Sequence, residues 1–228
     1  MASAVLVGST GLVGSSIVAT LISHSSISSL TAYSRRELPT NSTKLKALIS
    51  KDQDSWPSTF PSNANLFFSA LGTTRAAAGS LQNQRKIDYD LNLALARAAK
   101  ENGVSTYVLV STAGASHKSM FGYTKMKGEL EEAVKEIGFE HTVIVRPGLI
   151  CGDRNESRPA EWVVRKIAGA AGMVNERWLK DFWAQDAEVI ARAAVNAGLQ
   201  CAEGRNQKGV LILTQADIVR LGRTEWKG

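Results

Sequence analysis

Short apolar runs alternate with longer amphipathic segments along this 228-residue chain. The short runs predict strands at Ala4–Val7, Leu30–Tyr33, Ala47–Ser50, Asn65–Ala70, Tyr107–Ser111, Thr142–Arg146 and Val210–Leu213. The amphipathic segments predict helices at Leu12–His24, Ile87–Asn102, Tyr123–Ile137, Glu161–Gly169, Asp186–Leu199 and Gln215–Leu221. This alternation is typical of α/β domains in which helices cover both faces of a doubly wound parallel sheet.

Two segments depart from the alternation. Residues 41–63 are rich in Ser, Pro and Asn, which predicts a variable loop around a weak third strand. Residues 151–182 follow the last well-formed strand–helix unit, and we expect them to pack as a lid over the carboxyl ends of the strands. The prediction is therefore one domain over residues 1–228 with a small substrate-side segment near its C-terminus.

Composition adds a few limits. No apolar run reaches about 18 residues, so no membrane-spanning helix is expected. The two cysteines indicate a reduced compartment, and the three isolated histidines have no metal-ligand spacing, so no metal site is predicted. The first strand begins at Ala4, which leaves no room for a targeting peptide and favours the cytosol or the cytosolic side of a membrane.

The formal charge of +6 comes from 27 basic and 21 acidic residues. Its simplest interpretation is a solvated basic surface, although a phosphate-rich cofactor or anionic lipid would also be attracted to it. Nucleic acid is not an expected partner, because the chain has no Lys/Arg block and no ladder of aromatic residues.

A glycine-rich motif follows the first predicted strand and opens the first predicted helix. It reads Gly8-Ser9-Thr10-Gly11-Leu12-Val13-Gly14, the spacing of a dinucleotide-binding loop in a Rossmann fold. Gly8 would make the tight turn, Gly11 would admit the pyrophosphate to backbone amides, and Gly14 would let helix and strand pack closely. The helix N-terminus adds unpaired N–H groups that favour phosphate.

The ends of the second and fourth strands indicate which dinucleotide binds. Ser34, Arg35 and Arg36 stand where NAD enzymes usually carry an acidic residue for the ribose 2′-hydroxyl. Arginine and serine would instead bind a 2′-phosphate, so NADP(H) is the predicted cofactor. The alternative is that both arginines are ordinary exposed loop residues. At the fourth strand, Leu71-Gly72-Thr73 leaves the sheet on the cofactor side, where Gly72 would let the loop pass close to the cofactor.

The candidate reaction centre is a tyrosine and a lysine four residues apart. Tyr123 and Lys127 share one face of a predicted helix. A free phenol has a pKa of about 10, and a nearby ammonium with a positive nicotinamide ring would lower that pKa toward neutrality. Alone, the pair could be an ordinary surface pair; it gains weight from the hydroxyls of Ser111 and Thr112 just upstream. Strand pleating directs these hydroxyls oppositely, and Thr112 is favoured because it directly precedes a small Ala-Gly turn.

A resemblance to a known family rests on the stretches Val7–Gly14, Leu71–Arg75, Arg146–Gly148, Asp153–Trp162 and Ala216–Arg223. They resemble the atypical short-chain dehydrogenases/reductases, and most closely the Tat-interacting oxidoreductase-like group with its fungal mitochondrial outer-membrane members. The resemblance implies NADP(H) binding through the three glycines and Arg35, with Lys127 also holding the nicotinamide ribose. It implies that Pro147, Gly148 and Leu149 pass beside the nicotinamide carboxamide. It further implies peripheral attachment to the mitochondrial outer membrane.

The leading hypothesis is hydride transfer between NADPH and a small carbonyl compound. Tyr123 would donate the proton, Lys127 would tune the pKa of Tyr123, and Thr112 or Ser111 would polarise the substrate oxygen. A regulatory or binding protein gated by NADP(H) would keep the glycine motif without needing the tyrosine. An internal-redox isomerase or dehydratase would retain its cofactor through turnover. The two central predicted helices could also form a homodimer interface.

Overall fold

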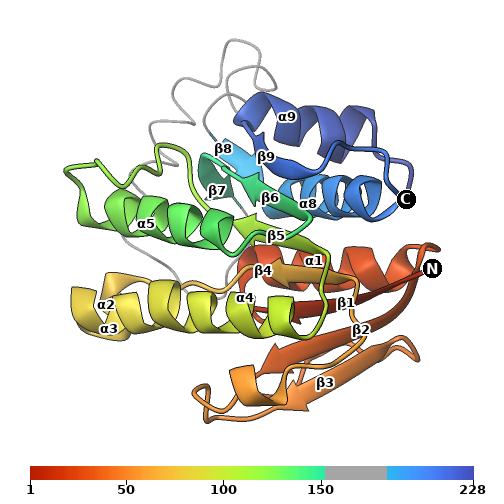
Figure 1. The fold of residues 1–228 in the computed structure, drawn as a ribbon, viewed down its shortest axis with the longest axis horizontal. Coiled ribbons are helices and arrows are strands. Elements are labelled where there is room, and N and C mark those ends of the chain that lie inside the picture. The colour runs from red at the N-terminus through yellow and green to blue at the C-terminus, as the bar shows by residue number, and fades with distance from the viewer. Residues whose placement is uncertain (152–183) are drawn as a thin grey trace.

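The computed structural model describes residues 1–151 and 184–228 (Figure 1). The predicted helix Glu161–Gly169 and, apart from its first residue, the predicted lid segment lie outside the described residues. The described strands include a seven-stranded parallel sheet with the order β3-β2-β1-β4-β5-β6-β9. Its strands are β1 (Ala2–Val7), β2 (Ile27–Ser34), β3 (Leu45–Ile49), β4 (Leu66–Ser69), β5 (Thr106–Val110), β6 (His141–Val145) and β9 (Gly209–Leu213). This order confirms the predicted doubly wound sheet, because the chain runs outward from β1 in both directions.

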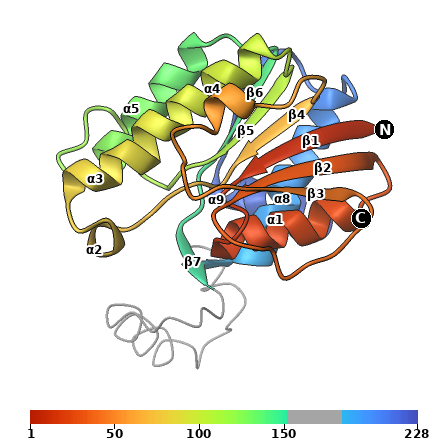
Figure 2. The ribbon, with the colours of Figure 1, turned by 90° about the horizontal axis from the view of Figure 1, so that it is seen from below.

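Helices cover both faces of the sheet (Figures 1 and 2). One face carries α1 (Leu12–Ser23) and α8 (Ala187–Ala202), and α9 (Gln215–Val219) with the π-helical turn η3 (Arg220–Thr224) packs against α8. The other face carries α4 (Asn92–Glu101), α5 (Gly122–Glu136) and the short 3-10 turn η1 (Pro57–Thr59). Between β4 and α4 lie α2 (Arg75–Ala78), α3 (Leu81–Arg85) and the π-helical turn η2 (Lys86–Leu91).

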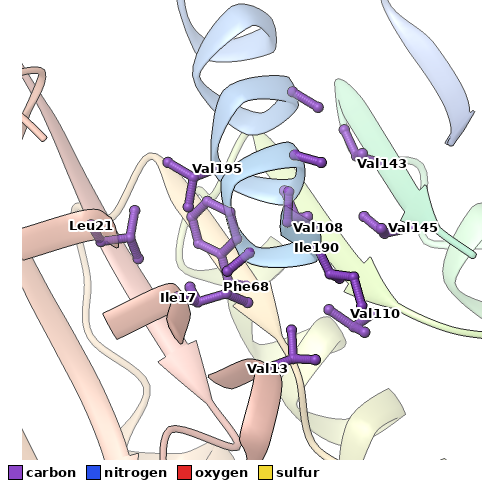
Figure 3. Close-up of a cluster of buried hydrophobic side chains, with 14 of the residues drawn as sticks. Val13, Ile17, Leu21, Phe68, Val108, Val110, Val143, Val145, Ile190 and Val195 are labelled. Atoms are coloured by element: carbon purple, nitrogen blue, oxygen red, sulfur yellow. The ribbon is translucent and has the colours of Figure 1, made fainter. Parts of the chain in front are cut away.

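Each face of the sheet buries its own apolar core. Under α1 and α8, Ile17 and Leu21 pack with Phe68 of β4 and with Ile190 and Val195 of α8 (Figure 3). Strands buried on both faces need apolar residues at successive positions, which is why their short apolar runs were predictive. Burial of this kind contributes roughly 1.5–3 kcal/mol for each large side chain.

The second core includes side chains from a predicted loop. Residues 41–63 were expected to form a variable loop around a weak third strand, and the structure has β3 there with irregular backbone around it. Trp56 and Phe60 of this segment are buried under α4. The ring centroid of Trp56 lies 5.3 Å from that of Tyr33, and the rings of Phe60 and Phe67 meet edge to face at 5.1 Å. The loop is therefore found, but the burial of these two aromatic residues was not predicted, because aromatic residues scattered among Ser and Pro carry no periodic signal.

A small parallel two-stranded sheet adjoins the carboxyl end of β6. It pairs β7 (Leu149–Cys151) with β8 (Ala184–Asp186), and neither strand was predicted. Three-residue strands lie below what an apolar run can reveal. None of the helices in the described part of the chain combines the length and the apolar composition that crossing a bilayer requires.

Candidate active site

The carboxyl ends of β1, β2, β4, β5 and β6 lie along one edge of the sheet, and the loops that follow them form the candidate site. Strand order reverses at β1, between β2 and β4. In open α/β sheets a ligand binds in the crevice at such a reversal. The predicted cofactor and reaction residues all follow these five strands.

The glycine loop fits against its surroundings only because its glycines lack side chains. Gly8 has a φ of +82°, and a Cβ on it would lie 2.4 Å from the backbone carbonyl of Ala70. A Cβ on Gly14 would lie 2.0 Å from the carbonyl oxygen of Gly8. The amide of Gly11 donates to that same oxygen at 3.0 Å, which closes the turn. Backbone therefore forms this part of the candidate site.

The N-terminus of α1 is suited to an anion. Gly11 is its N-cap and supplies no side-chain hydrogen bond, and no acidic residue occupies the first turn. The Ser9 hydroxyl donates to the carbonyl oxygen of Tyr33 at 2.7 Å, so this side chain anchors the loop to β2. Val13 is buried in the core and Leu12 packs against it, whereas Thr10 is exposed. Free N–H groups with the helix dipole favour phosphate at this position.

The end of β2 presents two free arginines. Arg35 and Arg36 are exposed, and neither guanidinium forms an ion pair or hydrogen bond with any part of the chain that the structure describes. The Ser34 hydroxyl donates to the carbonyl oxygen of Arg36 at 2.5 Å and accepts from the Arg36 amide at 3.2 Å. Ser34 thus shapes the turn that carries the arginines, and its direct contact with a 2′-phosphate stays a prediction.

The loop after β4 is fastened to η2 by buried polar side chains. The Thr73 amide donates to Asp88 Oδ1 at 2.6 Å, and Gln84 Nε2 donates to the Thr73 carbonyl at 3.0 Å. Asn92 Nδ2 reaches the carbonyl of Leu71 at 3.4 Å. These bonds fix the loop in which Gly72 is exposed.

Sequence reasoning assigned no role to Asp88 or Asn92. The available signal was two polar residues four apart on the apolar face of the predicted helix Ile87–Asn102. In the structure a π-helical turn replaces the start of that helix and turns both side chains inward. Turns of this kind often occur at functional sites.

Tyr123 and Lys127 lie on successive turns of α5, close to its N-terminus. Tyr123 is 44% exposed, whereas Lys127 is only 3% exposed and its Nζ donates to the carbonyl of Val110 at 3.3 Å. Burial lowers the pKa of Lys127, and the carboxylates of Asp88 and Glu131 raise it. Burial, with a smaller contribution from Asp88, raises the pKa of Tyr123 to about 12. The phenol is therefore protonated at neutral pH in the ligand-free protein.

The structure separates the two candidate hydroxyls. The Ser111 hydroxyl donates to Glu131 Oε1 at 2.5 Å, inside the fold. Arg146 holds the same carboxylate from the other side, with Nε 3.1 Å from Oε1 and Nη2 bonded to Oε2. Thr112 is only partly buried, and its hydroxyl has one weak contact at 3.4 Å, with the Ala113 carbonyl. Thr112 is the better placed of the two to meet a substrate oxygen.

Backbone bonds join the segment after β6 to the loop after β5. The Ala113 amide donates to the carbonyl of Pro147 at 2.7 Å, and the Gly148 amide donates to Gln185 Oε1 at 3.3 Å. Leu149 is exposed where β7 begins. Sequence reasoning also missed Gly128, where a Cβ would lie 2.2 Å from the Ser116 backbone. Without that glycine, α5 could not approach the loop that carries Thr112.

Sequence comparison finds relatives along nearly the whole chain. The model of the HIM1 family matches residues 36–171. The chain is 50% identical over 232 residues to "Protein fmp52-1, mitochondrial" of Aspergillus terreus, which covers 98% of this chain and 100% of that protein. It is 49% identical over 233 residues to "Protein fmp52, mitochondrial" of Emericella nidulans, with 98% and 100% covered.

Structure comparison finds the same fold in distant proteins. MoeE5 in complex with UDP-glucose and NAD has a TM-score of 0.68 at 18% identity, covering 92% of this chain and 75% of that one. A short chain dehydrogenase family protein from Francisella tularensis has a TM-score of 0.67 at 13% identity, covering 95% and 98%. Human epimerase family protein SDR39U1 with NADPH has a TM-score of 0.61 at 14% identity, covering 92% and 73%. These likenesses confirm the predicted Rossmann fold.

Proposed function

The chain belongs to the HIM1 family, together with the fungal mitochondrial Fmp52 proteins, and we propose that it is an NADP(H)-dependent oxidoreductase acting on a small carbonyl or alcohol. One observation carries this proposal. A solvent-accessible Tyr123 and a buried Lys127 lie one helical turn apart at the edge of the sheet that also carries the glycine loop. A phenol and an ammonium so placed can exchange a proton with a reacting oxygen.

The residues present fit a nicotinamide dinucleotide. A Cβ at Gly8 or Gly14 would fill the cradle, and the uncapped N-terminus of α1 suits a pyrophosphate. The exposed guanidinium groups of Arg35 and Arg36 suit the extra phosphate of NADP(H). Among the proteins of similar fold, MoeE5 is described with NAD and human SDR39U1 with NADPH, so the fold accommodates either dinucleotide. Backbone from Pro147 to Leu149 would lie beside the nicotinamide.

In the proposed reaction, bound NADPH supplies a hydride to the carbonyl carbon. The Thr112 hydroxyl donates a hydrogen bond to the carbonyl oxygen and favours the negative charge that develops there. Tyr123 Oη gives its proton to that oxygen, and the ammonium of Lys127 stabilises the phenolate that remains. Because Tyr123 is partly exposed, solvent can return the proton afterwards.

The direct test measures NADPH consumption with a panel of aldehydes and ketones. We expect turnover with the wild-type protein and a fall in kcat of about 10²–10⁴-fold for Tyr123→Phe, with NADPH affinity unchanged. Tyr89→Phe is the matched control, because its ring stacks on the Arg85 guanidinium at 4.2 Å and keeps that contact without the hydroxyl. Tight NADPH binding without turnover on any carbonyl compound would contradict the proposal.

A second function is favoured by one observation, the exposed apolar surface just before α5. Met120 is 97% exposed and Phe121 is 78% exposed, beside Tyr123. We propose as the alternative that NADP(H) gates the binding of a partner at this surface, in which case Tyr123→Phe would leave cellular function intact. Under either function we propose peripheral attachment to the mitochondrial outer membrane, which the mitochondrial names of the relatives support. A homodimer through α4 and α5 also stays a prediction.

A further inference from the structure

One buried carboxylate joins three segments of the candidate reaction centre. Glu131 lies about two turns further along α5 than Tyr123, and its exposed fraction is 0%. Its Oε1 accepts the Ser111 hydroxyl at 2.5 Å, at the carboxyl end of β5. Arg146, directly after β6, donates to the same carboxylate, with Nε 3.1 Å from Oε1 and Nη2 bonded to Oε2. The proposed reaction gives none of these three bonded side chains a role.

Each partner of Glu131 stands next to a part of the proposed reaction centre. Ser111 immediately precedes Thr112, whose hydroxyl would hold the substrate oxygen. Arg146 immediately precedes the backbone segment proposed to lie beside the nicotinamide. On α5 itself, Glu131 follows Lys127 by four residues, so the two side chains lie on one face of the helix. The carboxylate is therefore one residue, or about one helical turn, away from each of these parts.

The bonds to Glu131 restrict these segments more than the neighbouring contact does. Arg146 holds the carboxylate through two charge-assisted bonds, which fix its orientation as well as its distance. One turn earlier, Lys127 Nζ donates a single bond to the Val110 carbonyl at 3.3 Å, from a flexible stem. Because Glu131 also accepts from Ser111, a shift of α5 relative to either strand would break a bond to this carboxylate.

We propose that Glu131 is a positioning residue of the reaction centre. Through Ser111 and Arg146 it fixes the ends of β5 and β6 against α5. It thereby sets the separation between the Thr112 hydroxyl and Tyr123, which must both reach one substrate oxygen. The catalytic consequence rests on the proposed function. The fixing of the strand ends does not, because it can be measured without turnover.

Glu131→Gln is the test variant. Its amide matches the carboxylate in size, but it carries no charge and presents a donor in place of one of the two acceptor oxygens. Glu132→Gln is the matched control, because Glu132 is the next residue on α5, its side chain is 48% exposed, and it pairs with Lys135 at 2.9 Å. Ser111→Ala is a milder second variant, since it removes one bond and leaves the ion pair of Glu131 with Arg146 intact.

Two backbone amides report whether the ends of β5 and β6 stay together. The Ser111 amide donates to the Val145 carbonyl at 2.8 Å, and the Ala113 amide donates to the Pro147 carbonyl at 2.7 Å. These amides exchange with solvent only when the two strand ends separate or the whole protein unfolds. Their exchange rates can be measured by NMR without any nucleotide, and the amides of α1 report general unfolding in the same experiment.

The first measurement is this amide exchange. We expect both reporter amides to exchange at least about tenfold faster in Glu131→Gln than in Glu132→Gln, while the amides of α1 change by less than about twofold. Equal rates at the reporter amides in the two variants would overturn the proposal. So would an equal acceleration in α1, because that is a general loss of stability and not a local release of the strand ends.

The second measurement is turnover of NADPH, at a temperature where circular dichroism shows every variant folded. We expect kcat to fall about 10–100-fold in Glu131→Gln with the KM for NADPH nearly unchanged, because a displacement of about 1 Å can cost that much. Glu132→Gln should stay within about twofold of wild type. If Glu131 acts by placing Thr112, then Glu131→Gln should cost less in a Thr112→Ala background. The same cost in both backgrounds would overturn the positioning role, because loss of folded enzyme alone predicts it.

Two further outcomes keep the proposal decidable. If Glu131→Gln does not fold, Ser111→Ala takes its place, and we expect a smaller acceleration at the same two reporter amides. Unchanged exchange in a folded Ser111→Ala would then overturn the proposal. If the wild-type protein shows no turnover, the proposed function fails, while amide exchange still decides whether Glu131 fixes the strand ends.

Discussion

At the carboxyl end of β1 the site consists of backbone, whereas at the carboxyl end of β5 it depends on buried side-chain charges. The glycine loop contacts β4 and α1 so closely that a Cβ at Gly14 would overlap the Gly8 carbonyl. Around Lys127, by contrast, the buried groups are charged or polar: Glu131 of α5 forms an ion pair with Arg146 after β6, and the Lys127 ammonium donates to the Val110 carbonyl. Close packing of backbone atoms sets the conformation of the glycine loop, so this region needs no ligand to adopt it. In the second region burial raises the pKa of Tyr123 to about 12, so its phenol is un-ionised at neutral pH.

The largest effect is expected from a methyl group in the backbone-built region. Gly14→Ala places a Cβ 2.0 Å from the Gly8 carbonyl oxygen, so α1 must move away from the loop. We expect a loss of about 3 kcal/mol in the free energy of unfolding, measured by urea titration. We also expect an affinity for NADPH about 100-fold weaker, measured by nucleotide fluorescence, because the α1 amides no longer point at the pyrophosphate.

Gly122→Ala is the control for this stability loss. Its Cβ would lie 3.5 Å from Leu81 Cδ2, an ordinary contact, and alanine is the better helix former by up to about 1 kcal/mol. Wild-type stability and NADPH affinity in Gly14→Ala would show that the loop tolerates a side chain, and the contrast between the two regions would fail.

The same contrast explains how much of the fold the sequence could predict. Strand β5 was expected at Tyr107–Ser111 and lies at Thr106–Val110, because a strand buried on both faces is a continuous apolar run. The short helices α2 and α3 were missed, since each depends on a cap, by the hydroxyls of Thr74 and Ser80, rather than on apolar periodicity. Periodicity reports burial, and elements that bury little escape it.

For the candidate site, sequence spacing predicted the glycine loop and the Tyr123–Lys127 pair, because each is local, and their roles stay predictions. It did not reach Asp88 or Glu131. A charged residue on the apolar face of a predicted helix indicates an unusual environment but does not identify its partner. The pairing of Glu131 with Arg146 joins residues 15 apart in sequence through a side-chain contact that only the folded chain displays.

A smaller effect is expected at the end of β2, where local sequence sets cofactor choice. Replacing Arg35 and Arg36 by serine removes two exposed guanidinium groups from the predicted 2′-phosphate site. We expect NADPH affinity to weaken about tenfold, or about 1.4 kcal/mol, while NADH affinity stays the same. Arg97→Ser, an exposed arginine on α4, is the control and should change neither affinity. Equal losses for both nucleotides would mean that the arginines attract charge without recognising the 2′-phosphate.

The smallest effect tests whether the charge-built region is complete before the cofactor arrives. Tyr123 has a pKa raised to about 12, so in the folded protein its phenol stays protonated above the unfolded value of about 10. Between those pH values the unfolded chain has released this proton and the folded chain has not, so the free energy of unfolding falls as pH rises. Tyr123→Phe lacks that fall, and we expect a small difference in alkaline stability from wild type, since the side chain is 44% exposed and partly screened by water. The ultraviolet absorbance of tyrosinate, compared between the two proteins, checks the same ionisation directly. Suppose the difference between the two proteins shows that Tyr123 ionises at or below about pH 10 in the ligand-free protein. In that case the ammonium of Lys127 already lowers the pKa of Tyr123 more than burial raises it, and this region is as fully formed without ligand as the glycine loop.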